Sequence, residues 1–301
     1  MDGHWRESLL KFVHTEKHKC RLESGRNDSQ GADVLIFGNG EVSHFRSPPH
    51  KGQNDLWVFL SKEPQIKLKN RRAQLQWNGL FNYSVTFDRN TDASYHIFRP
   101  ILKSIYPAET RYYKPWTQKK LVRALWMVSH CTTTNHHQNI FSARERYAVE
   151  LSKHFPIEVF TSNLKNCGWA LKDLEGSIHE NENPNMSDYM FYLSFENNLC
   201  QDYITEKFWK ILESDDAMIP IALGGLSIED YNTIAPPNSF IHVKNFSSPE
   251  ALANHLKYIA KEPDAFNYYH QWRNSYRLNR SHHVSVSKRT LMYHGGIYSI
   301  S

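Results

Sequence analysis

The sequence predicts an α/β protein with two domains. Its 301 residues suffice for two domains of ordinary size, and a hydrophobic content of 40% is typical of a globular chain. Short β-rich apolar runs recur along the chain, and segments with helical spacing separate several of them. Strands that alternate with helices form parallel sheets covered by helices. We therefore expect doubly wound α/β domains.

The first domain is predicted to span residues 1–115. Its elements are two short buried strands, a polar helix-like run and an alternating strand, at 34–37, 56–60, 70–77 and 81–87. The domain begins close to the start of the chain, so its first strand is either absent or replaced by residues 9–13. A basic segment at 111–120, broken by a proline, is typical of a linker and places the boundary near residue 115.

The second domain is predicted to span residues 116–275, with a tail at 276–301. Its strands are expected at 121–128, 157–160, 191–195, 220–223 and 240–243, and its first helix at 142–154. Two further helices begin at residues that can act as N-caps, Thr205 and Ser248. This order of strands and helices predicts a doubly wound parallel sheet.

The segment 191–210 contains a strand, a polar loop and the start of a helix. Unpaired backbone N–H groups and the helix dipole make such a helix start attractive to an anion, and Lys207 adds a full positive charge. Glu206 would repel a phosphate at close range, but its carboxylate suits a pair of hydroxyls such as a ribose diol. The segment therefore predicts a site for a nucleotide with a diphosphate.

The composition argues against two classes of function. Thirty-six Lys and Arg residues against 31 Asp and Glu give a net charge of +5, which is too small and too dispersed to indicate nucleic-acid binding. The longest apolar runs are too short to span a bilayer, and residues 1–10 lack the apolar core of a secretion signal.

No metal site is expected from the sequence. The cysteines permit three complete disulfide pairings, and the sequence selects none of them. The four are Cys20, Cys131, Cys167 and Cys200. They show no zinc-ligand spacing with the histidines. The pair Asp215-Asp216 follows a predicted helix end, where solvated charge is the usual explanation.

Four motifs together resemble the donor-site signature of the α1,3-fucosyltransferases of glycosyltransferase family 10, which use GDP-fucose. They are Phe195-Glu196-Asn197, Tyr203, Thr205-Glu206-Lys207 and the segment 220–225. The resemblance implies the GT-B arrangement, in which two Rossmann-like domains face each other across a cleft. It departs from the family pattern at Pro64, Ile97 and His130.

The resemblance also implies roles for individual residues. The segment 57–64 is similar to a family segment whose glutamate is the proposed general base, and this role falls on Glu63. Segment 142–147 resembles the Ala-Arg-x-x-Tyr helix of the family, which makes Arg144 a phosphate ligand. Arg146 is expected to face solvent or a Glu partner on the same helix. The expected donor-binding residues are Ser129, Arg144, Tyr192, Asn197, Tyr203, Glu206 and Lys207. A role in core packing is equally compatible with Tyr192.

The function implied is inverting transfer of L-fucose from GDP-fucose, in α1,3 linkage, to a GlcNAc-containing glycan of a glycoprotein. The expected partners are GDP-fucose and an oligosaccharide or glycoprotein acceptor, with no nucleic acid and no required metal or other cofactor. The implied location is the Golgi lumen, with membrane attachment only through an anchor that this chain lacks. Two alternatives remain open: a transferase for another nucleotide sugar, and a catalytically silent nucleotide- or glycan-binding homologue.

Overall fold

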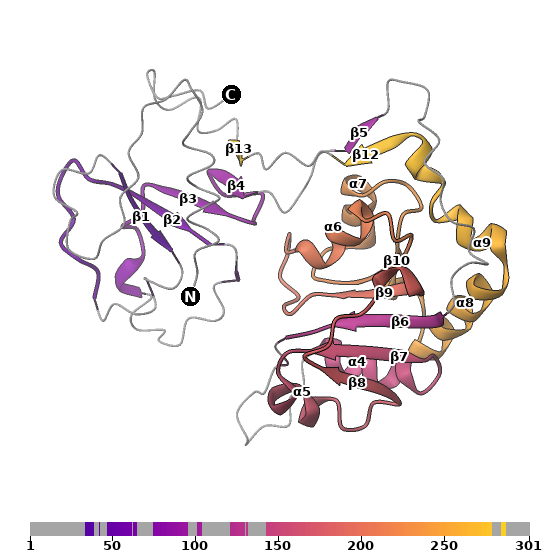
Figure 1. Ribbon diagram of the computed structural model, residues 1–301. Coiled ribbons are helices and arrows are strands. Elements are labelled where there is room, and N and C mark those ends of the chain that lie inside the picture. The colour runs from indigo at the N-terminus through magenta and orange to yellow at the C-terminus, as the bar shows by residue number, and fades with distance from the viewer. Residues whose placement is uncertain are drawn as a thin grey trace. The chain divides into compact units, whose positions relative to one another are not determined.

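The computed structural model in Figure 1 describes part of the chain. The described residues are 34–38, 42, 47–61, 63–64, 75–95, 101–103, 121–129, 131, 143–278 and 284–286. The chain forms two compact units, one of Met1–Leu60 with Leu68–Ser84 and the other of Ser61–Lys67 with Val85–Ser301. The predicted domain boundary near residue 115 and the predicted strand at 9–13 lie outside the described residues and stay predictions.

The first unit contains two of the predicted strands. Strands β1 (Val34–Gly38) and β2 (Leu56–Leu60) pair in parallel along their whole length. Residues 75–77 are helical, whereas the rest of the helix predicted at 70–77 lies outside the described residues. Strand β3 (Tyr83–Thr86) confirms the strand predicted at 81–87, and the division between the two units falls within it.

An aromatic cluster forms the core of the first unit. Phe37 and Trp57 project from the paired strands, with ring centroids 4.7 Å apart. Trp77 stacks on Phe81 at 5.7 Å, and both rings contact Phe37. Each such aromatic pair contributes about 0.5–1.5 kcal/mol beyond the area that it buries. This cluster packs the paired strands β1 and β2 against Trp77 and Phe81.

The core of the second unit is a six-stranded parallel sheet with the order β11-β10-β9-β6-β7-β8. In chain order the strands are β6 (Leu121–Met127), β7 (Ile157–Thr161), β8 (Gly176–Glu180), β9 (Tyr189–Phe195), β10 (Ile219–Leu223) and β11 (Ile241–His242). All are confirmed predictions except β8, which the sequence did not indicate. The chain runs outward from β6 in one direction and from β9 in the other, which is the doubly wound order.

Helices cover both faces of this sheet (Figure 1). Helices α4 (Ala143–Ser152) and α8 (Pro249–Lys261) share a core with Phe191, Leu193 and Phe195, whereas α6 (Glu206–Glu213) packs through Ile211 against Tyr192. Successive side chains of a strand point to opposite faces. Because both faces are covered, β7, β9 and β10 are buried along their entire lengths, as expected for a parallel sheet.

The helix starts agree with the predicted caps. The hydroxyl of Thr205 accepts a hydrogen bond from Lys207 N at the start of α6, and Ser248 caps α8 in the same way through Ala251 N. Three short helices were not predicted: α5 (Leu164–Ala170), α7 (Ile228–Ile234) and α9 (Pro263–Tyr268).

Part of the predicted tail at 276–301 is paired with other strands. Strand β12 (Tyr276–Leu278) lies antiparallel to β5 (Ile101–Lys103), and β13 (Val284–Val286) lies antiparallel to β4 (Ala93–Tyr95). The residues 276–278 and 284–286 are therefore strands, which the sequence did not indicate. Each strand has only three residues, too few for an alternating pattern to show in the sequence.

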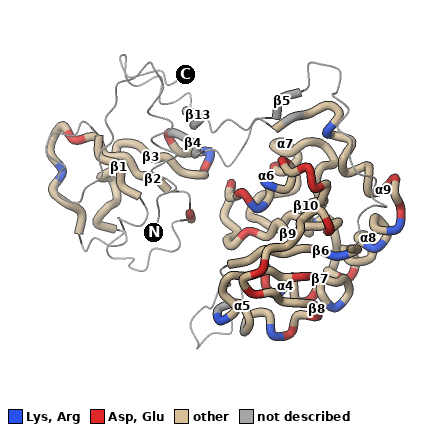
Figure 2. Tube along the Cα trace, in the orientation of Figure 1, with Lys and Arg blue, Asp and Glu red and all other residues tan. Residues whose placement is uncertain are grey.

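Acidic and basic residues are interspersed along the described chain (Figure 2). No described helix is both long enough and apolar enough to cross a bilayer. Among the described residues, no three or more His, Cys, Asp or Glu side chains form a group that could hold a metal ion.

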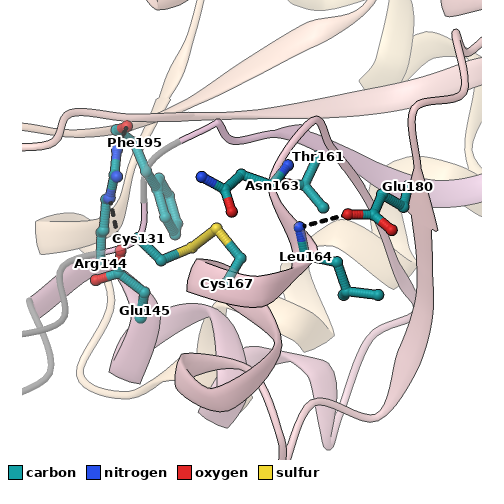
Figure 3. Close-up of a disulfide and its surroundings, with 9 residues drawn as sticks. All are labelled: Cys131, Arg144, Glu145, Thr161, Asn163, Leu164, Cys167, Glu180 and Phe195. Carbon is teal, nitrogen blue, oxygen red and sulfur yellow. Dashed lines mark hydrogen bonds and ion pairs between the residues drawn. A yellow bond between two sulfur atoms is a disulfide. The ribbon is translucent and has the colours of Figure 1, made fainter.

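The described residues contain one disulfide, and none of the three complete pairings of the four cysteines is observed, because Cys200 is free. Cys131, which follows β6, is bonded to Cys167 in α5, whereas Cys200 is a free thiol. Figure 3 shows the disulfide between Arg144 and Phe195 on one side and Leu164 on the other. It therefore attaches the segment after β6 to α5, next to the carboxyl end of β9.

We expect the double variant Cys131→Ser/Cys167→Ser to lose about 2–4 kcal/mol of unfolding free energy, because the bond closes a long loop and restricts the unfolded chain. Urea denaturation at neutral pH measures the loss. Cys200→Ser is the matched control, since its thiol forms no disulfide. An equal loss in both variants would show that serine, and not the missing bond, causes the effect.

Candidate functional site

The carboxyl ends of β6 and β9 mark the topological switch point of the parallel sheet. At this point the chain order reverses, and ligands of doubly wound sheets bind in the crevice that results. Ser129, an exposed residue, follows β6, and Glu196 follows β9. The predicted donor residues Asn197, Glu206 and Lys207 belong to the loop and helix that come directly after β9.

The loop between β9 and α6 lies against Gly224 and Gly225, which follow β10. A Cβ atom on Gly225 would lie 2.0 Å from the carbonyl oxygen of Cys200, and one on Gly224 would lie 2.6 Å from Tyr231 Oη. Gly225 therefore has no room for a side chain, because the backbone of the loop lies against it, whereas Gly224 faces the end of the Tyr231 side chain. Gly225 is required for the close approach of this loop, which accounts for its place in the motif.

Glu196 connects the end of β9 to the start of α6. Its side chain is only 1% exposed, and its carboxylate accepts hydrogen bonds from Thr205 N at 2.7 Å and from Thr205 Oγ1 at 2.8–2.9 Å. Lys207 Nζ lies 3.5 Å from the same carboxylate. Sequence reasoning placed Glu196 in a polar loop and assigned it no role, since nothing in the sequence shows that the loop is buried.

Burial raises the pKa of the Glu196 carboxyl above its ordinary value, although the Lys207 charge and the Thr205 hydrogen bonds act in the opposite direction. Because the pKa of Glu196 is higher in the folded than in the unfolded state, protonated Glu196 contributes to the unfolding free energy below the unfolded pKa of about 4.3. This contribution is lost as the pH rises through the folded pKa. Ionised Glu196 therefore lowers stability.

We expect Glu196→Gln to gain unfolding free energy relative to the parent protein as the pH rises above about 4.3, because glutamine cannot ionise. Urea denaturation of both proteins between acidic and neutral pH measures this difference. A difference that shrinks with rising pH would mean that Lys207 stabilises the carboxylate by more than burial destabilises it.

Lys207 and Glu206 form the open side of this cluster. Lys207 Nζ lies 2.9 Å from Thr205 Oγ1 and 3.1 Å from Glu206 Oε1, and its side chain is 23% exposed. The Glu206 side chain is 73% exposed. Although desolvation by the surrounding protein raises the pKa of Glu206, the Lys207 charge and hydrogen bond outweigh this effect and lower it. An ionised carboxylate and an ammonium group are thus side by side at a helix start.

Two further polar atoms of the candidate site are side-chain amide atoms in the loop between β9 and α6. Asn197 Oδ1 and Asn198 Nδ2 are buried, and neither has a hydrogen-bond partner among the described residues. A buried polar atom without a partner costs about 1–3 kcal/mol. Asn197 was predicted as a contact to the sugar donor, whereas Asn198 was not. Asn197 Oδ1 can accept a hydrogen bond from a ligand, and Asn198 Nδ2 can donate one.

Two other predicted donor residues are buried. Arg144 is 4% exposed, with Nε 3.0 Å from Glu145 Oε1 and Nη1 3.4 Å from the carbonyl oxygen of Phe195 (Figure 3). Tyr192 is 2% exposed within the core beneath α6, and burial raises the pKa of its hydroxyl. Arg146 is exposed, as predicted. Arg144 therefore lies at the correct sheet edge, but it is already held by protein groups.

The proposed base and the donor loop meet within the second unit. Glu63 is exposed, and its Oε2 accepts a hydrogen bond from Tyr203 Oη at 3.2 Å. Ser61 orients the backbone of Glu63, because its hydroxyl donates to Glu63 O at 2.6 Å and accepts from Glu63 N at 3.2 Å. Ser61 N in turn bonds Val85 O in β3.

The comparisons with known proteins identify the family. Residues 116–293 match the family model described as glycosyltransferase family 10 (fucosyltransferase), C-terminal. The chain belongs to glycosyltransferase family 10. It is 31% identical to alpha-(1,3)-fucosyltransferase C of Drosophila melanogaster, over 96% of this chain and 70% of that protein. It is 26% identical to alpha-(1,3)-fucosyltransferase fut-6 of Caenorhabditis elegans, over 90% of this chain and 67% of that protein.

A solved structure supports the fold of this fucosyltransferase family member. The chain is similar to a crystal structure of an alpha1,3-fucosyltransferase with GDP-fucose, with a TM-score of 0.54 and 17% sequence identity. The match covers 88% of this chain and 76% of the solved chain. The predicted family and the predicted GT-B-like α/β fold are therefore confirmed. The individual site assignments stay predictions.

Proposed function

We propose that this family 10 enzyme transfers L-fucose from GDP-fucose, with inversion and in α1,3 linkage, to a GlcNAc-containing glycan of a glycoprotein. The observation that carries the proposal is the pair of Lys207 and exposed Glu206 at the start of α6, in the segment that follows β9 at the switch point and that also contains Asn197, whose buried Oδ1 has no partner among the described residues. Lys207 suits a diphosphate, and Glu206 suits the hydroxyls of a sugar. The backbone N–H groups of Thr205, Lys207 and Phe208 already donate to Glu196 and Thr205.

The chemistry requires a base opposite a departing diphosphate. As the acceptor hydroxyl attacks the anomeric carbon, Glu63 takes its proton and the bond to the GDP oxygen breaks. Negative charge develops on the leaving diphosphate, and positive groups held beside it lower the barrier. Lys207 fills this role, and Arg144 joins it if its guanidinium turns from Glu145 toward the phosphate. One displacement of this kind inverts the anomeric configuration.

The proposal includes independence from a metal ion, because Lys207 supplies a positive charge beside the diphosphate site and its ammonium group already pairs with the nearby carboxylates of Glu196 and Glu206. Asp215 and Asp216 follow the C-terminal end of α6, opposite the end that begins after Thr205. We expect exhaustive chelation to leave the rate of transfer nearly unchanged. A complete loss of activity that manganese restores would contradict this expectation.

A panel of nucleotide sugars and glycan acceptors tests the proposed function. Fucose transfer from GDP-fucose, with the linkage and anomeric configuration of the product determined by NMR, is the expected result. Transfer from another donor alone would indicate a different sugar specificity, and donor binding without transfer would indicate a silent homologue. The Golgi lumen is the proposed location.

A further inference from the structure

Tyr203 was expected to contact the donor, but its hydroxyl points at Glu63. The side chain is 1% exposed, and Oη donates its hydrogen bond to Glu63 Oε2 at 3.2 Å. The ring packs edge-on against Phe87, with centroids 5.0 Å apart. A buried ring with this contact can place its hydroxyl in only a narrow range of positions.

Asp202, the residue before Tyr203, is held in place by hydrogen bonds from Arg89. Asp202 adopts a φ of 62°, in the left-handed region that non-glycine residues rarely occupy, and its side chain is 1% exposed. Its carboxylate accepts hydrogen bonds from Arg89 N at 3.2 Å and Arg89 Nε at 2.7 Å, while Arg89 Nη2 reaches Asp230 at 3.0 Å. A buried carboxylate bonded in this way fixes the backbone from which Tyr203 projects.

We propose that Tyr203 is a positioning residue for the base, and that Phe87 and the Arg89–Asp202 pair hold it in place. Its hydroxyl sets the orientation of the Glu63 carboxylate toward the acceptor, while the backbone of Glu63 is set by Ser61. This inference rests on the proposed function, since it assigns Tyr203 to the acceptor step rather than to donor binding. The same contacts connect the donor loop to the base, because Tyr203 and Asp202 are both part of that loop.

The test compares Tyr203→Phe with the parent enzyme. Phenylalanine keeps the ring against Phe87 and removes only the hydroxyl. We expect kcat for fucose transfer to fall roughly tenfold to a hundredfold, the range for a lost hydrogen bond to a charged group, while the Kd for GDP in calorimetry stays unchanged. In a Glu63→Gln background the same substitution is expected to cause little further loss, because the two groups act as one unit.

A second variant examines the support of Tyr203. Arg89→Lys keeps a positive charge beside Asp202 but cannot reproduce the fork of the guanidinium, so kcat is expected to fall by less than in Tyr203→Phe, again without a change in GDP affinity. Lys153→Ala, which breaks an exposed ion pair with Glu150 on α4, is the control and should equal the parent.

Two results would overturn the inference. One is a weaker GDP affinity with unchanged kcat in Tyr203→Phe, which would restore Tyr203 as a donor contact. The other is an equal fall of kcat in the parent and Glu63→Gln backgrounds, which would show that the two side chains act independently. An inactive parent enzyme would instead refute the proposed function together with this inference, so the two failures are distinguishable.

Discussion

Glu63→Gln is expected to reduce fucose transfer by roughly 10²–10⁴, the usual contribution of a general base, and to leave GDP-fucose binding nearly unchanged. Glutamine keeps the shape of the side chain and can still accept the hydrogen bond from Tyr203 Oη, but it cannot take the acceptor proton. The effect should therefore appear in kcat. Steady-state kinetics with a fixed acceptor, together with calorimetry on GDP-fucose, separates binding from chemistry.

The control for this variant is a carboxylate of comparable exposure away from the site. Glu182, 63% exposed beside His179, is suitable, and Glu182→Gln should transfer fucose at the parental rate. If Glu63→Gln also retained the parental rate, the spacing between Trp57 and Glu63 would have misidentified the base. Another carboxylate, or none, would then take the proton.

The elements next to the donor site were predictable because local sequence determines them. Strand β9 is a continuous β-rich run, and α6 has an apolar stripe preceded by the capping residue Thr205, so pattern and cap agree with the structure. Strand β8 was missed, since Gly176–Glu180 at the sheet edge is largely exposed and has no apolar alternation. Helix α7 has seven residues, too few to show a helical period.

The candidate site was only partly predictable for a different reason. Most of the predicted donor-side residues, from Tyr192 to Lys207, lie within one segment, whereas Ser129 and Arg144 lie earlier in the chain. The burial of Glu196 depends on packing against the region of Gly224, and the contact of Arg89 with Asp202 joins residues 113 positions apart. Likewise, Tyr203 and Glu63 are 140 positions apart. Single-sequence patterns contain no information about pairs at such separations, so roles that depend on these pairs required the fold.

Lys207→Ala is expected to weaken GDP binding by about 1.5–3 kcal/mol, roughly 10–150-fold in Kd, the cost of losing a hydrogen bond to a charged group. Isothermal calorimetry measures the change. Lys210→Ala, at an exposed lysine in the last turn of the same helix, is the matched control and should bind GDP as the parent does. Rising salt should reduce the difference between the two variants, because the interaction is electrostatic.

Lys207 has a second role that the experiment must separate from the first. Its ammonium group is 3.5 Å from the buried carboxylate of Glu196, so Lys207→Ala leaves that charge without its cation and destabilises the fold. The double variant Lys207→Ala/Glu196→Gln removes both charges and should recover stability while GDP affinity stays low. If GDP affinity also returned to the parental value, Lys207 would serve only to neutralise Glu196. The start of α6 would then be a structural cap rather than a diphosphate site.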